Sequence, residues 1–160
     1  MTQERTAVVI TCSSRAAAGV YSDRSGPVIV ETLRDWGLMV GEAIVVPDGP
    51  EVEEALREAV STGAALVVTT GGTGLTPTDG TPEATRRVLD RLVPGIAETI
   101  RAAGVRAGIP SAMLSRGVSG LAGRTLVVNL PGSTGGARDG LAVLEPILEH
   151  VFSQIQGGDH

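Results

Sequence analysis

Two carboxylates and a glycine-rich segment carry the residue types in this sequence that could perform chemistry. Asp79 lies in TTGGTGLTPTDGTPEAT, residues 69–85, which follows the apolar run AALVV. Asp48 lies in PDGP, which follows the apolar run AIVV. Carboxylates are ligands for Mg²⁺, and glycine lets backbone N–H groups approach an anion closely. These features predict an anionic ligand held mainly by backbone N–H groups, with a divalent cation on the acids.

Each of these features also has an ordinary structural interpretation. Asp-Gly is a common turn, and aspartate is a common turn or capping residue in loops. GGTG, residues 71–74, lacks the spacing of the dinucleotide fingerprint, and on its own it favours a turn. The length of the surrounding loop favours a function instead. In addition, Thr81 and Pro82 already predict the start of the next helix, with Thr81 as N-cap, so Asp79 is not needed as a cap.

A second candidate anion site lies near the end of the chain. Gly132 and Ser133 stand in LPGST, between an apolar run and the last predicted helix. This segment is equally suited to an anion nest and to a simple serine cap. Arg116, in LSRG, could reach a phosphate or be solvated. The predicted loops add further positive charge from Arg15, Arg24 and Arg138.

Histidine and cysteine chemistry are not indicated. His150 lies in the last predicted helix and His160 in the tail, and neither has a partner at metal-ligand spacing. The sequence shows no Ser-His-Asp set and no Cys-His pair, and Cys12 lies in an apolar run that predicts a buried, inert thiol. An enzyme with these residues would position its substrates and neutralise charge, as phosphoryl-type transfers require.

The elements that position these residues alternate between strands and helices. Apolar runs predict strands at 8–11, 40–47, 64–70 and 124–130. Helical periodicity and start signals predict helices at 26–36, 50–63, 81–92, 94–104 and 137–156. We expect a long loop at 13–26, a short strand and turn within 111–120, and a frayed tail at 157–160. The alternation predicts an α/β fold with a mostly parallel sheet covered on both faces, and ligands at the carboxyl ends of its strands.

Composition limits the remaining possibilities. The chain has 160 residues, 42% of them hydrophobic, which is the size of one domain, so we expect residues 1–160 to form a single domain. Its net charge of −5 argues against a nucleic-acid surface, and all 13 basic residues are arginines, which excludes lysine Schiff-base chemistry. No apolar run reaches the length of a membrane span, and no signal-peptide pattern is present, so we expect a cytoplasmic location.

Several motifs occur together in a recognisable order. TTGGTG, TPTDGTPEAT, PGIAETIR, LSRGVSG and VVNLPGS, together with AGVYSDRSGP and VVPD, resemble the Mog/MoaB family of molybdenum cofactor biosynthesis over nearly the whole chain. The resemblance implies a three-layer α/β/α fold of the molybdopterin-binding-domain type, usually a homotrimer. It also implies a molybdopterin adenylyltransferase, which joins molybdopterin to the AMP part of ATP, uses Mg²⁺ and releases pyrophosphate.

The same resemblance assigns roles to individual residues. By motif match, Asp48 and Asp79 are the catalytic and metal-binding acids. The family's nucleotide-binding positions correspond to Gly71, Gly72, Thr73, Gly74 and Thr76. Its molybdopterin-binding positions correspond to Ser14, Ser115, Arg116, Pro131, Gly132 and Ser133. The chain departs from the family pattern at Gly80 and Thr134, where valine or threonine and proline are frequent.

Two alternatives to the adenylyltransferase remain open at this point. The first is a non-catalytic molybdopterin-binding or scaffold protein of the same pathway, as expected for some MoaB-like members. The second is another nucleotide-using enzyme on the same fold. In each case 160 residues are too few to contain the molybdenum-insertion step as well, so that step would be fused elsewhere or supplied by a partner protein.

Overall fold

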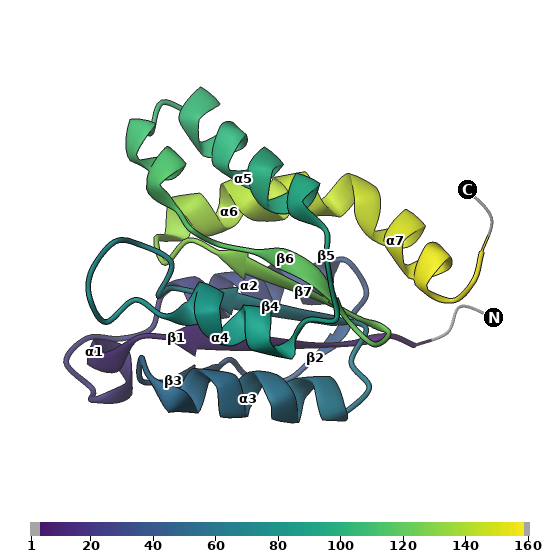
Figure 1. Ribbon diagram of the computed structural model, residues 1–160, viewed down its shortest axis with the longest axis horizontal. Helices are drawn as coiled ribbons and strands as arrows, with labels where there is room; N and C mark the ends of the chain where they lie inside the picture. Colours follow the sequence, from purple (N-terminus) through teal and green to yellow (C-terminus); the bar gives the residue numbers. More distant parts are fainter. Residues whose placement is uncertain (1–3, 159–160) are drawn as a thin grey trace.

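A seven-stranded sheet forms the middle layer of residues 4–158, the part of the chain that the computed structural model describes (Figure 1). Its strand order is β2-β1-β4-β7-β6-β5, and β3 also pairs with β1. The strands are β1 (Thr6–Cys12), β2 (Met39–Val40), β3 (Ile44–Val46), β4 (Leu66–Thr70), β5 (Arg91–Leu92), β6 (Ser119–Ala122) and β7 (Thr125–Leu130). The β1, β2, β3, β4 and β7 pairings are parallel, whereas β6 pairs antiparallel with β7 and β5. The predicted mostly parallel sheet is confirmed.

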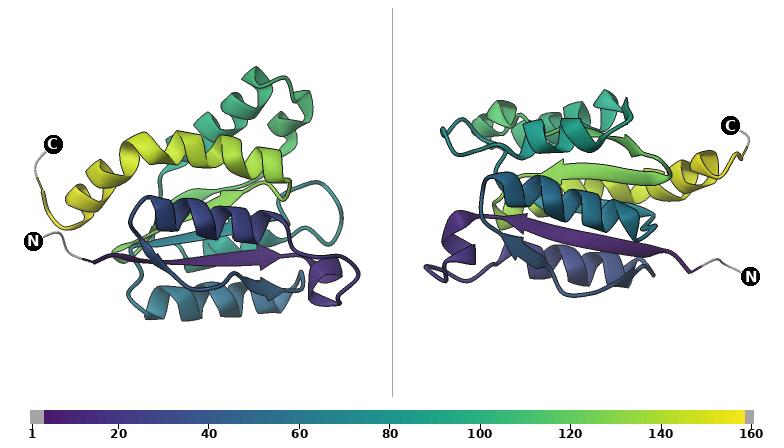
Figure 2. Two further views of the ribbon diagram at one scale, coloured as in Figure 1. Left: turned by 180° about the vertical axis from the view of Figure 1, so that it is seen from behind. Right: turned by 60° about the horizontal axis from the view of Figure 1, so that its bottom comes forward.

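Helices cover both faces of this sheet (Figure 2). They are α1 (Ser14–Ala17), α2 (Ser25–Asp35), α3 (Pro50–Ser61), α4 (Thr81–Val88), α5 (Pro94–Arg106), α6 (Thr134–Leu144) and α7 (Leu148–Ile155), with short 3₁₀ turns η1 (Pro110–Leu114) and η2 (Glu145–Ile147). One core packs α2, α5, α6 and α7 against the sheet, and the other packs α3 and α4 against the opposite face. The three-layer α/β/α arrangement is therefore confirmed.

The central strands are apolar along their whole length because both of their faces are buried. Val67 and Val68 are neighbours in β4, yet they belong to opposite cores, as the two-residue period of a strand requires. All five residues of β4 are buried. The strands therefore read as continuous apolar runs rather than alternating ones.

The strand predicted at 40–47 is two short strands. Met39 pairs with Thr6 and Ile44 pairs with Ile10, so both β2 and β3 lie along β1. Two residues of β1, 8–9, separate the paired segments, whereas three residues, 41–43, separate them on the other side. The extra residue is a bulge, which divides the strand.

The largest differences from the predicted helices are in α4 and in the last predicted helix. Thr81 is not the N-cap of α4: Gly80 occupies that position without a side-chain bond, and Thr81 is the buried first residue of the helix. The helix ends at Val88, because 91–92 pair with β6 as β5. The predicted helix 137–156 begins earlier, at Thr134, and is interrupted at η2, where Pro146 has no N–H to donate.

The less regular segments match the predictions more closely. The loop predicted at 13–26 contains only the single-turn helix α1 before α2 begins. Segment 111–120 supplies most of η1 and the start of β6, so the predicted short strand and turn are present. Residues 159–160 of the predicted tail, including His160, lie outside the described residues. Within residues 4–158, every helix is too short or too polar to cross a bilayer.

Candidate functional site

Four loops meet at the carboxyl edge of the sheet. They follow the parallel strands β1, β3, β4 and β7, and they gather at the end of the molecule opposite the two termini (Figure 1). A cavity of about 900 Å³ lies among these loops, and we call it the acidic cavity. Its lining includes Ser14, Asp48, Thr76, Asp79 and Ser133. The prediction that these loops share one edge is confirmed.

A second cavity, of about 810 Å³, adjoins the first. We call it the η1 cavity, because α5 and η1 form one wall with apolar side chains such as Ile100, Ile109 and Leu114. The rest of its lining includes the predicted site residues Gly71, Gly72, Thr73, Gly74, Asp79, Ser115, Pro131, Gly132 and Ser133. Five of these residues also line the acidic cavity: Gly71, Gly72, Asp79, Gly132 and Ser133. Two separate ligands could therefore meet at this shared wall.

Glycine is required at the start of the loop after β4. Gly71 and Gly72 have φ of +93° and +68°, a region that disfavours side chains. A Cβ on Gly71 would collide with the carbonyl oxygen of Cys12, and a Cβ on Gly72 would collide with the Thr81 hydroxyl. The backbone therefore turns sharply between β1 and β7, and Gly132 packs against Gly71 from the other side.

Both glycine loops contain backbone N–H groups at residues that line the cavities. The N–H of Gly71 donates to the carbonyl of Leu130 at 3.2 Å, which ties the two loops together. The N–H groups of 72–74 donate to no protein acceptor within the described part of the chain. Ser133 caps α6 by accepting the N–H of Gly136 at 3.0 Å. The serine-cap interpretation of LPGST is therefore confirmed, and the anion nest stays a prediction.

Asp48 presents one satisfied and one unsatisfied carboxylate oxygen. Its Oδ2 accepts the N–H of Ser14 at 3.3 Å and the hydroxyl of Ser14 at 3.2 Å, and its own N–H donates to that hydroxyl oxygen at 3.1 Å. Its Oδ1 is buried and has no hydrogen-bond partner among residues 4–158. A buried carboxylate oxygen without a partner is costly, and this observation fits a site that gains a cation with its ligand.

Asp79 closes a turn and also lines both cavities. Its Oδ2 accepts the N–H of Thr76 at 3.1 Å, and its own N–H donates to the carbonyl of Thr76 at 3.0 Å. The turn interpretation of this aspartate is therefore correct, and it does not exclude a role in binding. The turn fixes the direction of the carboxylate at the wall that both cavities share.

Few other metal ligands lie near these two acids. Within the described residues, no group of three or more His, Cys, Asp or Glu side chains could hold a metal ion. Mg²⁺ commonly uses only one or two carboxylates, with water and substrate phosphates completing its shell. Asp48 and Asp79 thus fit a magnesium ion that enters with a phosphate-bearing substrate.

Arg116 holds the glycine-rich loop rather than facing either cavity. Its Nε donates to the carbonyl of Gly74 and its Nη2 to the carbonyl of Asp79, both at 2.9 Å. Its backbone N–H donates to the carbonyl of Thr73 at 2.8 Å. The guanidinium also pairs with Glu83, which lowers the pKa of that carboxyl. Arg116 therefore fixes both ends of the turn that carries Asp79.

We expect Arg116→Gln to loosen this loop and to lower the free energy of unfolding by about 1–2 kcal/mol, because a shorter neutral side chain loses charge-assisted bonds to two carbonyls. Urea denaturation measures the change, and hydrogen exchange at 74–80 should quicken. Arg138→Gln, at an exposed position on α6, is the matched control and should change stability by less than about 0.5 kcal/mol. Equal effects of the two substitutions would contradict the role given to Arg116.

Sequence reasoning missed several residues of the acidic cavity. Asp23 accepts the hydroxyl of Thr11 at 2.8 Å and the N–H of Gly26 at 3.1 Å, so it fixes the start of α2 beside the cavity. The signal was its position three residues before Gly26, at the predicted start of a helix. Thr70 bonds the Ser25 hydroxyl at 3.0 Å and the Pro131 carbonyl at 2.8 Å, which joins three of the four loops.

Of the three arginines that were expected to add positive charge to the loops, two line the acidic cavity and one lies on the surface. Arg15 and Arg24 line the acidic cavity, so positive charge lies beside the two acids. Arg138 is exposed and lines none of the described cavities.

Cys12 is buried at the end of β1, as predicted, with 2% of its surface exposed. Burial raises the pKa of its thiol to about 12, and the charge of Asp48 adds to that rise. A thiol that stays protonated is not a nucleophile.

Several known proteins are similar to this chain in sequence and in fold. A bifunctional molybdenum cofactor biosynthesis protein of Synechococcus elongatus is 41% identical over 155 residues, which are 96% of this chain and 48% of that protein. This chain thus spans about half the length of that relative. A molybdopterin adenylyltransferase of Helicobacter pylori is 36% identical over 153 residues, covering 93% of this chain and 86% of that protein. The solved structure of the Mog protein of Mycobacterium ulcerans superposes with a TM-score of 0.90 at 52% identity, over 94% of this chain and 99% of that one.

The family match covers most of the described fold. Residues 8–150 match the MoCF_biosynth family, described as a probable molybdopterin binding domain. This range includes all four loops of the sheet edge and both cavities. The chain therefore belongs to the MoCF_biosynth family.

Proposed function

We propose that this protein is a molybdopterin adenylyltransferase, which transfers AMP from Mg-ATP to the phosphate of molybdopterin and releases pyrophosphate. One observation carries the proposal: two adjoining cavities share a wall built from two glycine loops and Asp79. A reaction between two phosphate-bearing substrates needs such a meeting point. Relatives named molybdopterin adenylyltransferase, similar over nearly the whole chain, support it.

The protein's own groups would position the reacting phosphates. The N–H groups of 72–74 and of the first turn of α6 would hold phosphate oxygens at the shared wall. Asp79 and Asp48 would hold the Mg²⁺ that accompanies ATP. When bound, that ion supplies charge neutralisation for the departing pyrophosphate. Arg116 would keep the turn bearing Asp79 in place during the reaction.

The proposed transfer balances without a general base. An oxygen of the molybdopterin phosphate attacks the α-phosphorus of ATP and forms a new P–O–P linkage. The bond between the α-phosphorus and the oxygen that bridges it to the β-phosphorus breaks. The electron pair leaves with pyrophosphate. A phosphate nucleophile is already ionised near neutral pH, so no proton has to be removed from it. Neither the buried thiol of Cys12 nor the exposed His150 is needed.

The proposal extends to the oligomeric state, the location and the partner of the enzyme. We propose a cytoplasmic homotrimer whose product passes to a molybdenum-insertion protein. Ile109, Met113 and Leu114 expose apolar side chains around η1, and contact between copies would cover such a surface. No nucleic-acid or membrane partner is proposed.

The test is turnover by the purified chain. With molybdopterin, ATP and Mg²⁺ we expect adenylated molybdopterin and an equal amount of pyrophosphate, and no product after the metal is removed with EDTA. Molybdopterin binding without any product in the presence of Mg²⁺ would contradict the proposal, and would favour the non-catalytic binding protein. Product formed with another nucleotide but not with ATP would contradict the assigned nucleotide.

A further inference from the structure

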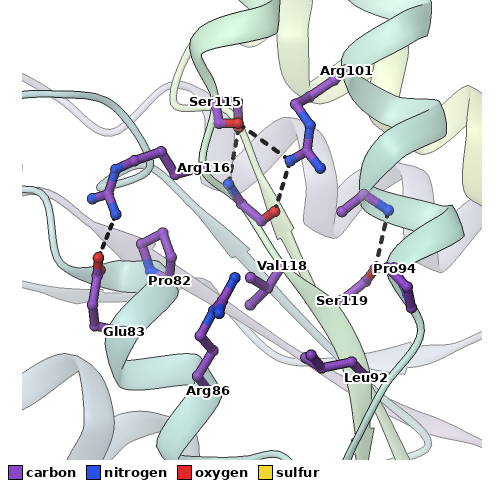
Figure 3. Close-up of a pocket in the computed structure, with 12 residues that line it drawn as sticks. Pro82, Glu83, Arg86, Leu92, Pro94, Arg101, Ser115, Arg116, Val118 and Ser119 are labelled. Carbon is purple, nitrogen blue, oxygen red and sulfur yellow. Dashed lines mark hydrogen bonds and ion pairs between the residues drawn. The ribbon is translucent and has the colours of Figure 1, made fainter.

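A third cavity, of about 450 Å³, is lined by residues of α4, α5 and β6 and of the segment 115–118. We call it the arginine pocket, because Arg86, Arg101 and Arg116 line it together with the single acid Glu83 (Figure 3). It meets the η1 cavity only at Arg101 and Ser115. The function proposed above gives this pocket no role.

Positive charge gathers here although the chain as a whole carries a net charge of −5. Three guanidinium groups and one carboxylate line the pocket, which leaves an excess of two positive charges. The protein satisfies only some of their donors. Arg101 donates through Nη1 to the carbonyls of Ser115 at 3.2 Å and Gly117 at 2.9 Å. Arg116 is bonded to the carbonyls of the glycine-rich loop and paired with Glu83.

Arg86 is the least engaged of the three arginines. Its side chain forms no hydrogen bond or close ion pair within residues 4–158, and its charge acts on Glu83 only at longer range, where it helps to lower the pKa of that carboxyl. Figure 3 shows it extending from α4 into the pocket, between Pro82 and Val118. By contrast, the next residue, Arg87, pairs with Glu53 at 2.6 Å on the side of α3. The side chains of Arg86 and Arg87 thus point to different sides of α4, although the two residues are neighbours in sequence.

The rest of the lining strengthens attraction for an anion. Leu92, Pro94 and Val118 supply apolar surface, and reduced exposure to water makes charge–charge attraction stronger. Helix α5 begins at Pro94 with no acid in its first turn, and the hydroxyl of Ser119 accepts the N–H of Ala97 at 3.0 Å. Its N-terminus therefore adds a small favourable field to that of the arginines.

We propose that the arginine pocket binds a phosphate-class oxyanion, either free inorganic phosphate or the diphosphate group of pyrophosphate. Guanidinium groups present planar pairs of N–H donors that match the spacing of phosphate oxygens. Proteins commonly bind phosphate groups through clustered arginines for this reason. The pocket is larger than one phosphate, so the longer anion also fits. The bound anion competes with Glu83 for Arg116.

Because of this competition, two substitutions are expected to change the affinity for the anion in opposite directions. Arg86→Gln removes the unused donor and should weaken anion binding about tenfold, the effect of a lost charge-assisted bond. Glu83→Gln removes the competing carboxylate and should tighten binding about two- to fivefold, the range of an exposed ion pair. Both side chains are exposed, so both variants should fold.

The experiment is isothermal titration of inorganic phosphate, and separately of pyrophosphate, into the wild-type chain and the variants without divalent metal. Arg87→Gln is the matched control: it changes the net charge equally on the same helix but outside the pocket, so the affinity should stay within about twofold of wild type. The two anions distinguish a site for one phosphate from a site for two.

Three outcomes would overturn the proposal: no anion binding, equal losses in Arg86→Gln and Arg87→Gln, or weaker binding in Glu83→Gln. None of the three residues lines the acidic cavity or the η1 cavity. The proposal therefore does not rest on adenylyl transfer, and failure of that activity would leave these affinities as predicted.

Discussion

Asp79→Asn should lower the rate of adenylyl transfer at least about 100-fold while leaving the fold intact, because an amide cannot neutralise a metal ion as a carboxylate does. Asparagine has the same shape, and its amide oxygen can still accept the N–H of Thr76. The turn that positions residue 79 should therefore persist. The effect should appear in kcat, since the interaction matters most as charge develops on the leaving pyrophosphate.

Steady-state kinetics with molybdopterin and Mg-ATP, together with thermal unfolding, measure both halves of this prediction. Asp35→Asn, at an exposed position near the end of α2, is the matched control, since it makes the same chemical change far from the sheet edge. We expect its turnover to equal that of the wild type. Turnover of Asp79→Asn within a few-fold of wild type would remove this aspartate from the proposed mechanism.

Gly71→Ala is expected to lower the free energy of unfolding by about 2–4 kcal/mol, the range of backbone strain combined with overpacking. Two unfavourable contributions to the free energy of folding combine at this position. The backbone φ of +93° disfavours any side chain, and the added Cβ would collide with the carbonyl of Cys12. That carbonyl belongs to β1, a strand held between neighbours on both sides, so it cannot move away easily.

Urea denaturation of the variant and the wild type gives this difference directly. Gly95→Ala is the matched control, because a Cβ there meets open space and the residue lies in the first turn of α5. It should be neutral or stabilise the protein by up to about 0.5 kcal/mol. Similar unfolding curves for Gly71→Ala and Gly95→Ala would show that the tight crossing of the two glycine loops is not required.

The position of the site could be predicted from the sequence because it depends on strand direction alone. Apolar runs such as 64–70 and 124–130 are recognisable, and parallel strands bring the segments that follow them to one edge. Asp48, Asp79 and Ser133 were therefore expected together, and they line one cavity. Here local patterns and the parallel-sheet rule were enough.

The details that were missed depend on contacts between distant residues. Arg116 reaches carbonyls that precede it by 42 and 37 residues, and no local pattern indicates where a long side chain will find acceptors. The bulge that divides β2 from β3 depends on register against β1. Thr81 lost its predicted cap position because tertiary packing buried it beneath Gly72.

The central claim is that Asp48 and Asp79, in the loops that follow β3 and β4, hold the metal of a bound nucleotide. A crystal structure with a non-hydrolysable ATP analogue and Mn²⁺ in place of Mg²⁺ tests it most directly, because anomalous scattering locates the ion. We predict the ion on the carboxylates of Asp79 and Asp48, with nucleotide phosphates against the N–H groups of 72–74. An ion that contacts neither aspartate, or a nucleotide bound away from this edge of the sheet, would contradict the account.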